Sequence, residues 1–244
     1  VVFCTVCGSM RYTNRFFAET LADPATASPL VFPETVFNSP ASHLAAYLAR
    51  AGVNYTLLGD QGVFLQGLAT AADWLDDGDA DGCLVIAAEE TDWTMAEALH
   101  LFSRQVVPSE GAAALYLRRL PGRDHPLPCL AAVTSPQLYA GDRSRLEAAR
   151  AMRAELPPSQ AETLLVDGLQ DAPRFDRVEE TLWHDWPFAR QSPKRVLGEG
   201  LAAATGWQCV AAVQALARQA CTSAIVSAVG CNQQAIGARF YDSA

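Results

Sequence analysis

The chain has 244 residues, half of them apolar and 18% charged, which fits one large folded domain or two small ones and excludes a mainly disordered protein. Its formal net charge is −9, whereas nucleic-acid-binding proteins carry a basic surplus to neutralise phosphates, so that class is disfavoured. No apolar run reaches the roughly 18 to 20 residues of a membrane-spanning helix, and the first residues do not form a signal peptide, so we expect a soluble, cytoplasmic protein.

The first half of the chain alternates short β-rich runs with helical segments. Asn38-Ser39-Pro40 predicts a helix start, because a cap residue is followed by proline where its missing N–H is harmless; Gly52 predicts the end of this helix. The segment 62–75 is apolar nearly all round, which indicates a helix inside the protein. We expect strands over residues 1–6, 54–58 and 83–88, and helices over 14–21, 38–51 and 62–75.

The second half continues the alternation and contains a second buried helix. We expect strands over residues 111–117, 129–133, 163–166, 224–229 and 235–240, and helices over 144–155, 175–183 and 197–217. Strands that alternate with buried helices predict an α/β layered fold. Two apolar helices, 62–75 and 197–217, favour sheets packed on both sides of them, and a single doubly wound sheet is the alternative. No linker divides residues 1–244, so we expect one domain.

The cysteines and histidines do not form a metal-binding pattern. Seven cysteines, mostly in apolar runs, indicate buried reduced thiols, and Cys4-x-x-Cys7 has no second cysteine pair or nearby histidine. The four histidines show no metal-ligand spacing, and the common nucleotide-binding and serine-hydrolase motifs are absent. We therefore expect no metal ion and no cofactor.

The turn before the buried helix 62–75 is the strongest candidate for a site. A residue at the start of such a helix faces unpaired N–H groups and the positive end of the helix dipole, a field that enzymes use to activate nucleophiles. Here this turn carries Asp60, which we expect to cap the helix, and Gln61.

Five segments together resemble the β-ketoacyl synthases of the thiolase fold. Gly78-Asp79-Ala80-Asp81 is similar to the turn that follows the family's catalytic helix, and four later segments match in order: residues 108–115, 166–179, 194–206 and 227–240. The resemblance implies a thiolase-like layered fold, helix/sheet/helix/sheet/helix, shortened at the N-terminus.

The departures from this family fall on its catalytic positions. Gln61 stands where the resemblance places the nucleophilic cysteine, Gly168 and Glu199 stand at its two histidines, and Lys194 is retained. Condensation needs a thiolate to carry the acyl chain and imidazoles to assist decarboxylation. An amide cannot form the thioester, glycine has no side chain, and a carboxylate opposes a developing enolate. We therefore expect no catalytic residues in this chain.

A glutamine in place of the cysteine resembles the chain-length-factor subunits of type II polyketide and aryl polyene systems. This implies a non-catalytic subunit that forms a heterodimer with an active β-ketoacyl synthase and shapes its acyl tunnel in polyketide or fatty-acid-type biosynthesis. The family's dimer edge falls on Tyr55, Thr56, Leu57 and Leu58.

An acidic acyl carrier protein is expected to dock mainly on the partner, because this chain is itself acidic. Arg143, Arg145, Arg150 and Arg153 form either a local exception or a solvated helix face.

Two other functions remain open at this point. One is a malonyl-carrier decarboxylase or altered acyltransferase that uses Gln61, and the other is a scaffold or binding module with an acyl pocket. Glu199 can also have a purely structural role, paired with Lys194 or Arg195 one helical turn away. Glu89 or Glu90 is expected to satisfy backbone N–H groups at the end of a buried strand.

Overall fold

The computed structural model describes residues 1–49, 52–120, 127–158 and 162–242. In chain order the strands are β1 (Val2–Thr5), β2 (Tyr55–Leu58), β3 (Gly82–Glu89), β4 (Gly111–Arg118), β5 (Cys129–Val133), β6 (Gln137–Leu138), β7 (Thr163–Val166), β8 (Arg190–Gln191), β9 (Ser223–Val229) and β10 (Gln234–Tyr241). The helices are α1 (Met10–Ala22), the 3-10 helix η1 (Phe32–Thr35), α2 (Ser39–Tyr47), α3 (Val63–Asp77), α4 (Trp93–Phe102), α5 (Asp142–Glu155), α6 (Pro173–Leu182), α7 (Lys194–Leu197) and α8 (Leu201–Ala217).

Two sheets share one topology. The first has the order β2-β1-β3-β4, and the second has the order β8-β7-β9-β10-β5, with β6 also paired to β10. In each sheet three parallel strands are followed by an antiparallel one: β3 pairs with β4 as β9 pairs with β10. In each half a long helix, α3 or α8, leads into the strand next to the antiparallel partner. The chain therefore contains an internal structural repeat that its sequence does not show as a fixed period.

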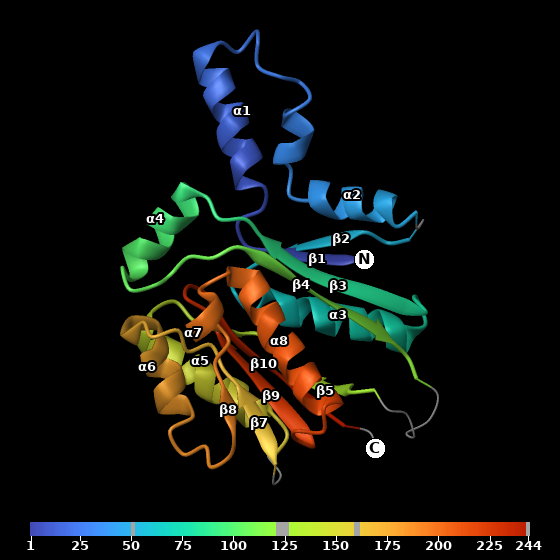
Figure 1. Cartoon of the computed structure of the whole chain (residues 1–244), viewed down its shortest axis with the longest axis vertical. Helices are drawn as coiled ribbons and strands as arrows, with labels where there is room; N and C mark the ends of the chain where they lie inside the picture. Colours follow the sequence, from blue (N-terminus) through green and yellow to red (C-terminus); the bar gives the residue numbers. More distant parts are fainter. Residues whose placement is uncertain (50–51, 121–126, 159–161, 243–244) are drawn as a thin grey trace.

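The two long helices of the repeat form the middle layer. α3 and α8 lie between the sheets (Figure 1) and join both of them in one apolar core. Phe64, Leu65 and Leu68 on α3 are fully buried, as are Ala202 and Cys209 on α8. This burial explains why most side chains of both helices are apolar, as the sequence indicated, while Asp73, Asp76 and Asp77 of α3 are exposed.

Further helices lie outside the two sheets (Figure 1). α5 and α6 pack on the second sheet, where Met152 meets Leu165 and Ile225. The segment α1-η1-α2 projects from the side of the first sheet (Figure 1). The predicted layered arrangement of helix, sheet, helix, sheet and helix is confirmed, and the alternative of a single doubly wound sheet is wrong.

Several predicted boundaries differ from the structure for local reasons. The last predicted helix begins at Leu201 and not at Leu197, because Gly198 takes a φ of +81° and the next residue joins an isolated bridge, Pro108 to Glu199. The helix after Asn38 ends at Tyr47, and residues 50–51 of the prediction lie outside the described residues. α4 was not predicted, although the Asp92 carboxylate caps its start by accepting the N–H of Thr94.

None of the helices in the described ranges combines the length and apolarity needed to cross a bilayer.

Candidate functional site

Gln61 lies directly before the glycine that begins α3. Gly62 is the N-cap of the helix, and the Gln61 side chain is 2% exposed. Its Nε2 atom is buried and has no hydrogen-bond partner among the described residues. The structure thus places an unpaired amide donor at the start of the central helix.

The second central helix begins at the same place. Gly200 is the N-cap of α8 and Glu199 precedes it, as Gln61 precedes Gly62. The hydroxyl of Thr205 donates to the main-chain oxygen of Gln61 at 2.6 Å and joins the two helix starts. Two positive helix ends therefore converge, which favours acidic side chains here.

Glu199 is completely buried and paired with Lys194. The Lys194 Nζ donates to Glu199 Oε2 at 2.9 Å, while Glu199 Oε1 accepts the N–H of Leu201 at 2.8 Å in the first turn of α8. Burial alone would lower the pKa of Lys194, but the charge and hydrogen bond of Glu199 outweigh burial and raise this pKa. Arg195, the other partner considered for Glu199, pairs instead with Asp171.

Gly168 lies beside this ion pair, and a side chain at this position would have to displace the carboxylate of Glu179. The N–H of Gly168 donates to Glu179 Oε2 at 2.7 Å. A Cβ on Gly168 would stand 2.8 Å from that oxygen and 3.6 Å from Lys194 Nζ. Burial, followed by the charge of Asp167, raises the pKa of Glu179. Gln61, Glu199 and Lys194 therefore lie in one buried region with Gly168.

Asp60 does not cap α3, which corrects the expectation from its sequence position. Its Oδ2 accepts the N–H groups of Asn232, Gln233 and Gln234 at 3.3, 2.8 and 3.2 Å, and α3 has no side-chain cap. The acceptor faces the turn between β9 and β10 because this turn lies across the start of α3.

Cys231, in the same turn, is a further member of the site, although its place in the sequence indicated no chemical role. Its Sγ lies 3.8 Å from Asp60 Oδ1. Burial and the negative charges of Asp60 and Glu199 raise the pKa of Cys231 to about 12, so the thiol stays protonated near neutral pH. A protonated thiol without a general base is a poor nucleophile.

Glu89 secures the end of β1 near the start of α8. Its carboxylate accepts the N–H groups of Val6 and Cys7 and the hydroxyl of Thr5, as expected for one of the two glutamates at the end of the buried strand β3. Burial raises the pKa of Glu89 to about 7, although these donors oppose the shift. Burial and the Glu89 charge raise the pKa values of Cys4 and Cys7 to about 12.

In the described part of the chain, no group of three or more potential ligands could hold a metal ion.

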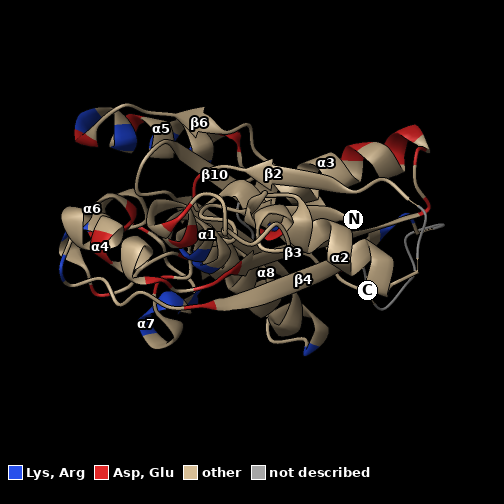
Figure 2. Ribbon diagram, turned by 90° about the horizontal axis from the view of Figure 1, so that it is seen from above, with Lys and Arg blue, Asp and Glu red and all other residues tan. Residues whose placement is uncertain are grey.

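The arginine residues of α5 do not form one surface cluster. Arg145 is 5% exposed and turned toward the β9–β10 turn, and Arg153 pairs with Asp185 at 2.8 Å. Arg143 and Arg150 are exposed. Figure 2 shows basic residues on α5 and α7, and acidic residues at the far end of α3.

The expected interface strand lies at a sheet edge. β2 pairs only with β1 among the described strands, and Tyr55 and Leu58 are 46% and 49% exposed. More than half of the exposed large apolar side chains of the described residues lie between Tyr12 and Leu58. α1, a helix of 13 residues, buries none of its side chains. This apolar surface, formed by α1, η1, α2 and β2, is called the apolar arm below.

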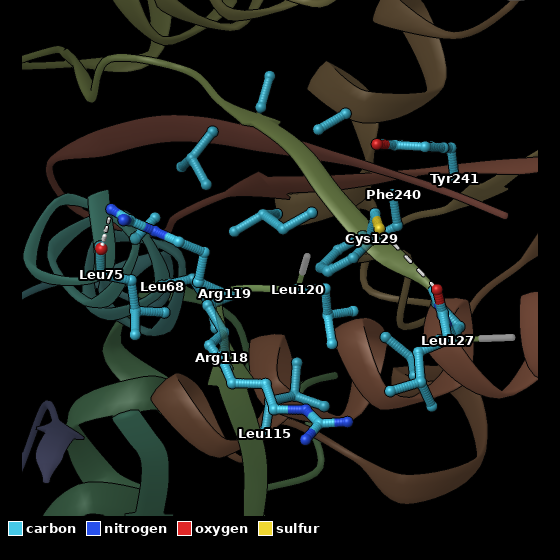
Figure 3. Close-up of a pocket in the computed structure, with 18 of the residues that line it drawn as sticks. Leu68, Leu75, Leu115, Arg118, Arg119, Leu120, Leu127, Cys129, Phe240 and Tyr241 are labelled. Atoms are coloured by element: carbon cyan, nitrogen blue, oxygen red, sulfur yellow. Dashed lines mark hydrogen bonds between the residues drawn. The ribbon is translucent and has the colours of Figure 1, made fainter. Parts of the chain in front are cut away.

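A large cavity lies away from the helix starts. It has a volume of about 1160 Å³, and apolar residues near the C-terminal end of α3 and on β4 and β5 line much of it (Figure 3). Leu68, Leu75 and Leu115 are on its wall, together with Arg118 and Arg119. Since none of the lining residues belongs to the buried region around Gln61, the cavity is a separate feature.

Comparison with solved structures identifies the fold. A chain of the ishigamide ketosynthase/chain length factor superposes with a TM-score of 0.80 at 19% identity, over 99% of this chain and 72% of that one. The chain has the ketosynthase fold. A β-ketoacyl synthase from Burkholderia phymatum gives a TM-score of 0.79 at 14% identity, over 99% of this chain and 74% of that one.

A third similar structure has the ketosynthase fold and holds a carrier protein. It is a type II polyketide synthase acyl-carrier protein in complex with its ketosynthase bound to the hexaketide, with a TM-score of 0.78, 13% identity, and coverage of 99% of this chain and 75% of that one. No protein-family model and no curated protein matches the sequence. The fold predicted from the five segments is thus confirmed.

Proposed function

We propose that this chain is a non-catalytic ketosynthase-like subunit that forms a heterodimer with an active β-ketoacyl synthase and shapes its acyl tunnel, in polyketide or fatty-acid-type biosynthesis. The observation that carries the proposal is Gln61, an amide at the start of α3 where the resemblance calls for a thiolate. Glu199 and Gly168 supply no imidazole, and Lys194 is already engaged by Glu199. A ketosynthase-like chain with these residues lacks the nucleophile and both of its assisting groups.

The apolar arm supports association with a partner. Its exposed side chains are concentrated on one segment and continue onto the edge strand β2, whose outer edge has no strand partner among the described residues. Contiguous apolar surface of this kind marks interaction sites, and an unpaired strand edge invites pairing. A ketosynthase/chain length factor is among the structures with the same fold.

Co-expression with active β-ketoacyl synthases tests the proposal. We expect a complex of two different subunits in size-exclusion chromatography with light scattering, and condensation only when the synthase is present. Leu58→Arg in β2 should weaken the complex at least tenfold, because it places a charge in the interface core. Leu138→Arg is the matched control, since Leu138 is 75% exposed in β6 of the other sheet. A stable monomer that binds no synthase offered to it would overturn the proposal.

Gln61→Cys tests whether the nucleophile alone is missing or the assisting imidazoles are missing as well. We expect this variant to gain no condensation activity, because positions 168 and 199 still carry no imidazole. Appreciable condensation by the isolated variant would show that these two positions are competent and would contradict a non-catalytic role.

One observation favours a second function, decarboxylation of a malonyl carrier. The unpaired Nε2 of Gln61 could donate to the carbonyl oxygen of a thioester. This function requires turnover by the isolated chain that Gln61→Ala abolishes. The absence of both imidazoles makes it the weaker proposal.

A further inference from the structure

The carboxylate of Asp60 holds the turn between β9 and β10 by accepting hydrogen bonds from its backbone N–H groups. Three consecutive N–H groups, those of Asn232, Gln233 and Gln234, converge on Asp60 Oδ2. Such a row of backbone donors is a strong binding site for an anion. The carboxylate lies so close to Gly230 that a Cβ there would stand 1.9 Å from Oδ2, so this contact requires a glycine.

The same turn is held from its acceptor side by a buried arginine. Arg145 Nε donates to the carbonyl oxygen of Gly230 at 3.0 Å, and its Nη2 donates to that of Val229 at 3.3 Å. The hydroxyl of Tyr139 also donates to Gly230 O. The guanidinium lies over the Phe175 ring, 5.8 Å from its centroid. Arg145 takes part in no ion pair of the described residues.

The charges of Asp60 and Arg145 are thus stabilised by the same turn: its N–H groups donate to the carboxylate, and its carbonyl oxygens accept from the guanidinium. Asp60 is 5% exposed and Arg145 is 5% exposed, and each would be costly to bury without its partners. Moving the turn outward would deprive the carboxylate of three donors and the guanidinium of two acceptors. Since Asp60 immediately precedes Gln61, the turn is fixed to the start of α3 itself.

We infer that Asp60 and Arg145 are positioning residues that lock the β9–β10 turn, residues 230–233, closed over the start of α3. The lock holds Cys231 beside Asp60 and keeps the buried amide of Gln61 covered. This inference goes beyond the proposed function, because it concerns the access of any acyl group to the helix start and holds whether or not a partner binds.

Hydrogen exchange at single amides tests the donor side of the lock. In Asp60→Ala we expect the amides of Asn232, Gln233 and Gln234 to exchange roughly tenfold faster, because they lose a charged acceptor. Amides within the β9–β10 ladder should change less than about threefold. Asp185→Ala, which removes an exposed carboxylate from its pair with Arg153, should leave all of these rates unchanged. Unchanged exchange at the three turn amides in Asp60→Ala would overturn the inference.

Thiol labelling tests whether both residues act on the same closure. With iodoacetamide, and with each rate corrected for the thiolate fraction of Cys231 in that variant, we expect Cys231 to react about tenfold faster in Asp60→Ala and in Arg145→Leu. Cys209, fully buried in α8, reports opening of the whole core and should not change. An equal rise at Cys209 and Cys231, or no rise at either, would overturn the inference.

The double variant and a conservative variant complete the test. Because the two residues close one turn, the double variant Asp60→Ala/Arg145→Leu should label Cys231 no faster than the faster single variant. Independent, multiplied effects would contradict a shared lock. If Asp60→Ala does not fold, Asp60→Asn keeps the shape and one acceptor oxygen, and it should show the same changes with a smaller amplitude.

Discussion

The buried pair of Lys194 and Glu199 gives the most direct test of how the site is stabilised. In Lys194→Met the Glu199 carboxylate, 0% exposed, would keep only its bond from the N–H of Leu201. Breaking a buried pair from one side typically costs about 3–5 kcal/mol. The start of α8 stabilises the remaining negative charge and offsets part of this loss. We therefore expect Lys194→Met to lower the free energy of unfolding by about 3 kcal/mol.

The partner and double variants separate the ion pair from the packing. Glu199→Gln keeps an acceptor for Leu201, so its loss should be smaller, about 2 kcal/mol. The double variant Lys194→Met/Glu199→Gln contains neither buried charge, and we expect it to be more stable than Lys194→Met by at least about 1 kcal/mol.

Urea denaturation, followed by circular dichroism and fluorescence, measures these differences at constant pH. Coincident transitions and equal denaturant slopes are required for the comparison to hold. A loss below about 1 kcal/mol in Lys194→Met, or a double variant less stable than that single variant, would refute the reasoning.

Three further predictions concern pH, packing and the lost imidazole. Burial raises the pKa of Glu89 from 4.5 to about 7, so between these pH values the folded state binds more protons than the unfolded state. The free energy of unfolding should therefore fall as pH rises from 4.5 to 7. Urea denaturation at a series of pH values should show a shallower fall in Glu89→Gln. Gly206→Val should destabilise the protein by about 3 kcal/mol in thermal unfolding, because a Cβ there would lie 2.5 Å from the Cβ of Ala113. The control Gly141→Ala has open space around it and should change stability by less than about 0.5 kcal/mol. Similar losses in the two variants would contradict the close packing inferred at Gly206. Gly168→His should lose about 2 kcal/mol in the same assay and gain no activity, because Glu179 occupies the space of the side chain, and a neutral effect would show that this space can open.

The middle layer could be predicted because the apolar composition of its helices indicates that they are buried. α3 is apolar nearly all round, and a helix of that kind has to be largely buried, so the sandwich of sheets followed from composition and order. Gln61 and Glu199 were placed in one site only through the resemblance, which put them at the cysteine and at one histidine of the family; the start of α8 beside Glu199 was not predicted. The break at Gly198 was not predicted because Leu197 before it and the leucine and alanines of 201–204 after it favour one continuous helix.

The lock could not be predicted because its members are distant in the chain. Asp60 meets Gln233 only once β10 lies across α3, and no local pattern records that contact. For Arg145 a signal was present: it shares a helical face with Ala149 and Met152, both fully buried, at spacings of four and seven residues. The exposed Arg143 and Arg150 on the same helix give this segment the overall charge of a solvated face, which masks the apolar periodicity around Arg145.

The position of β10 has a consequence for synthesis on the ribosome. Strands β1 to β4 form the first sheet from segments that all emerge early, whereas β5 has to wait for β10, with Leu130 pairing to Phe240. A nascent chain therefore exposes the edges of β5 and β9 until β10 has been translated. Exposed strand edges of this kind promote aggregation, so chaperone supply during translation should govern the yield of folded protein.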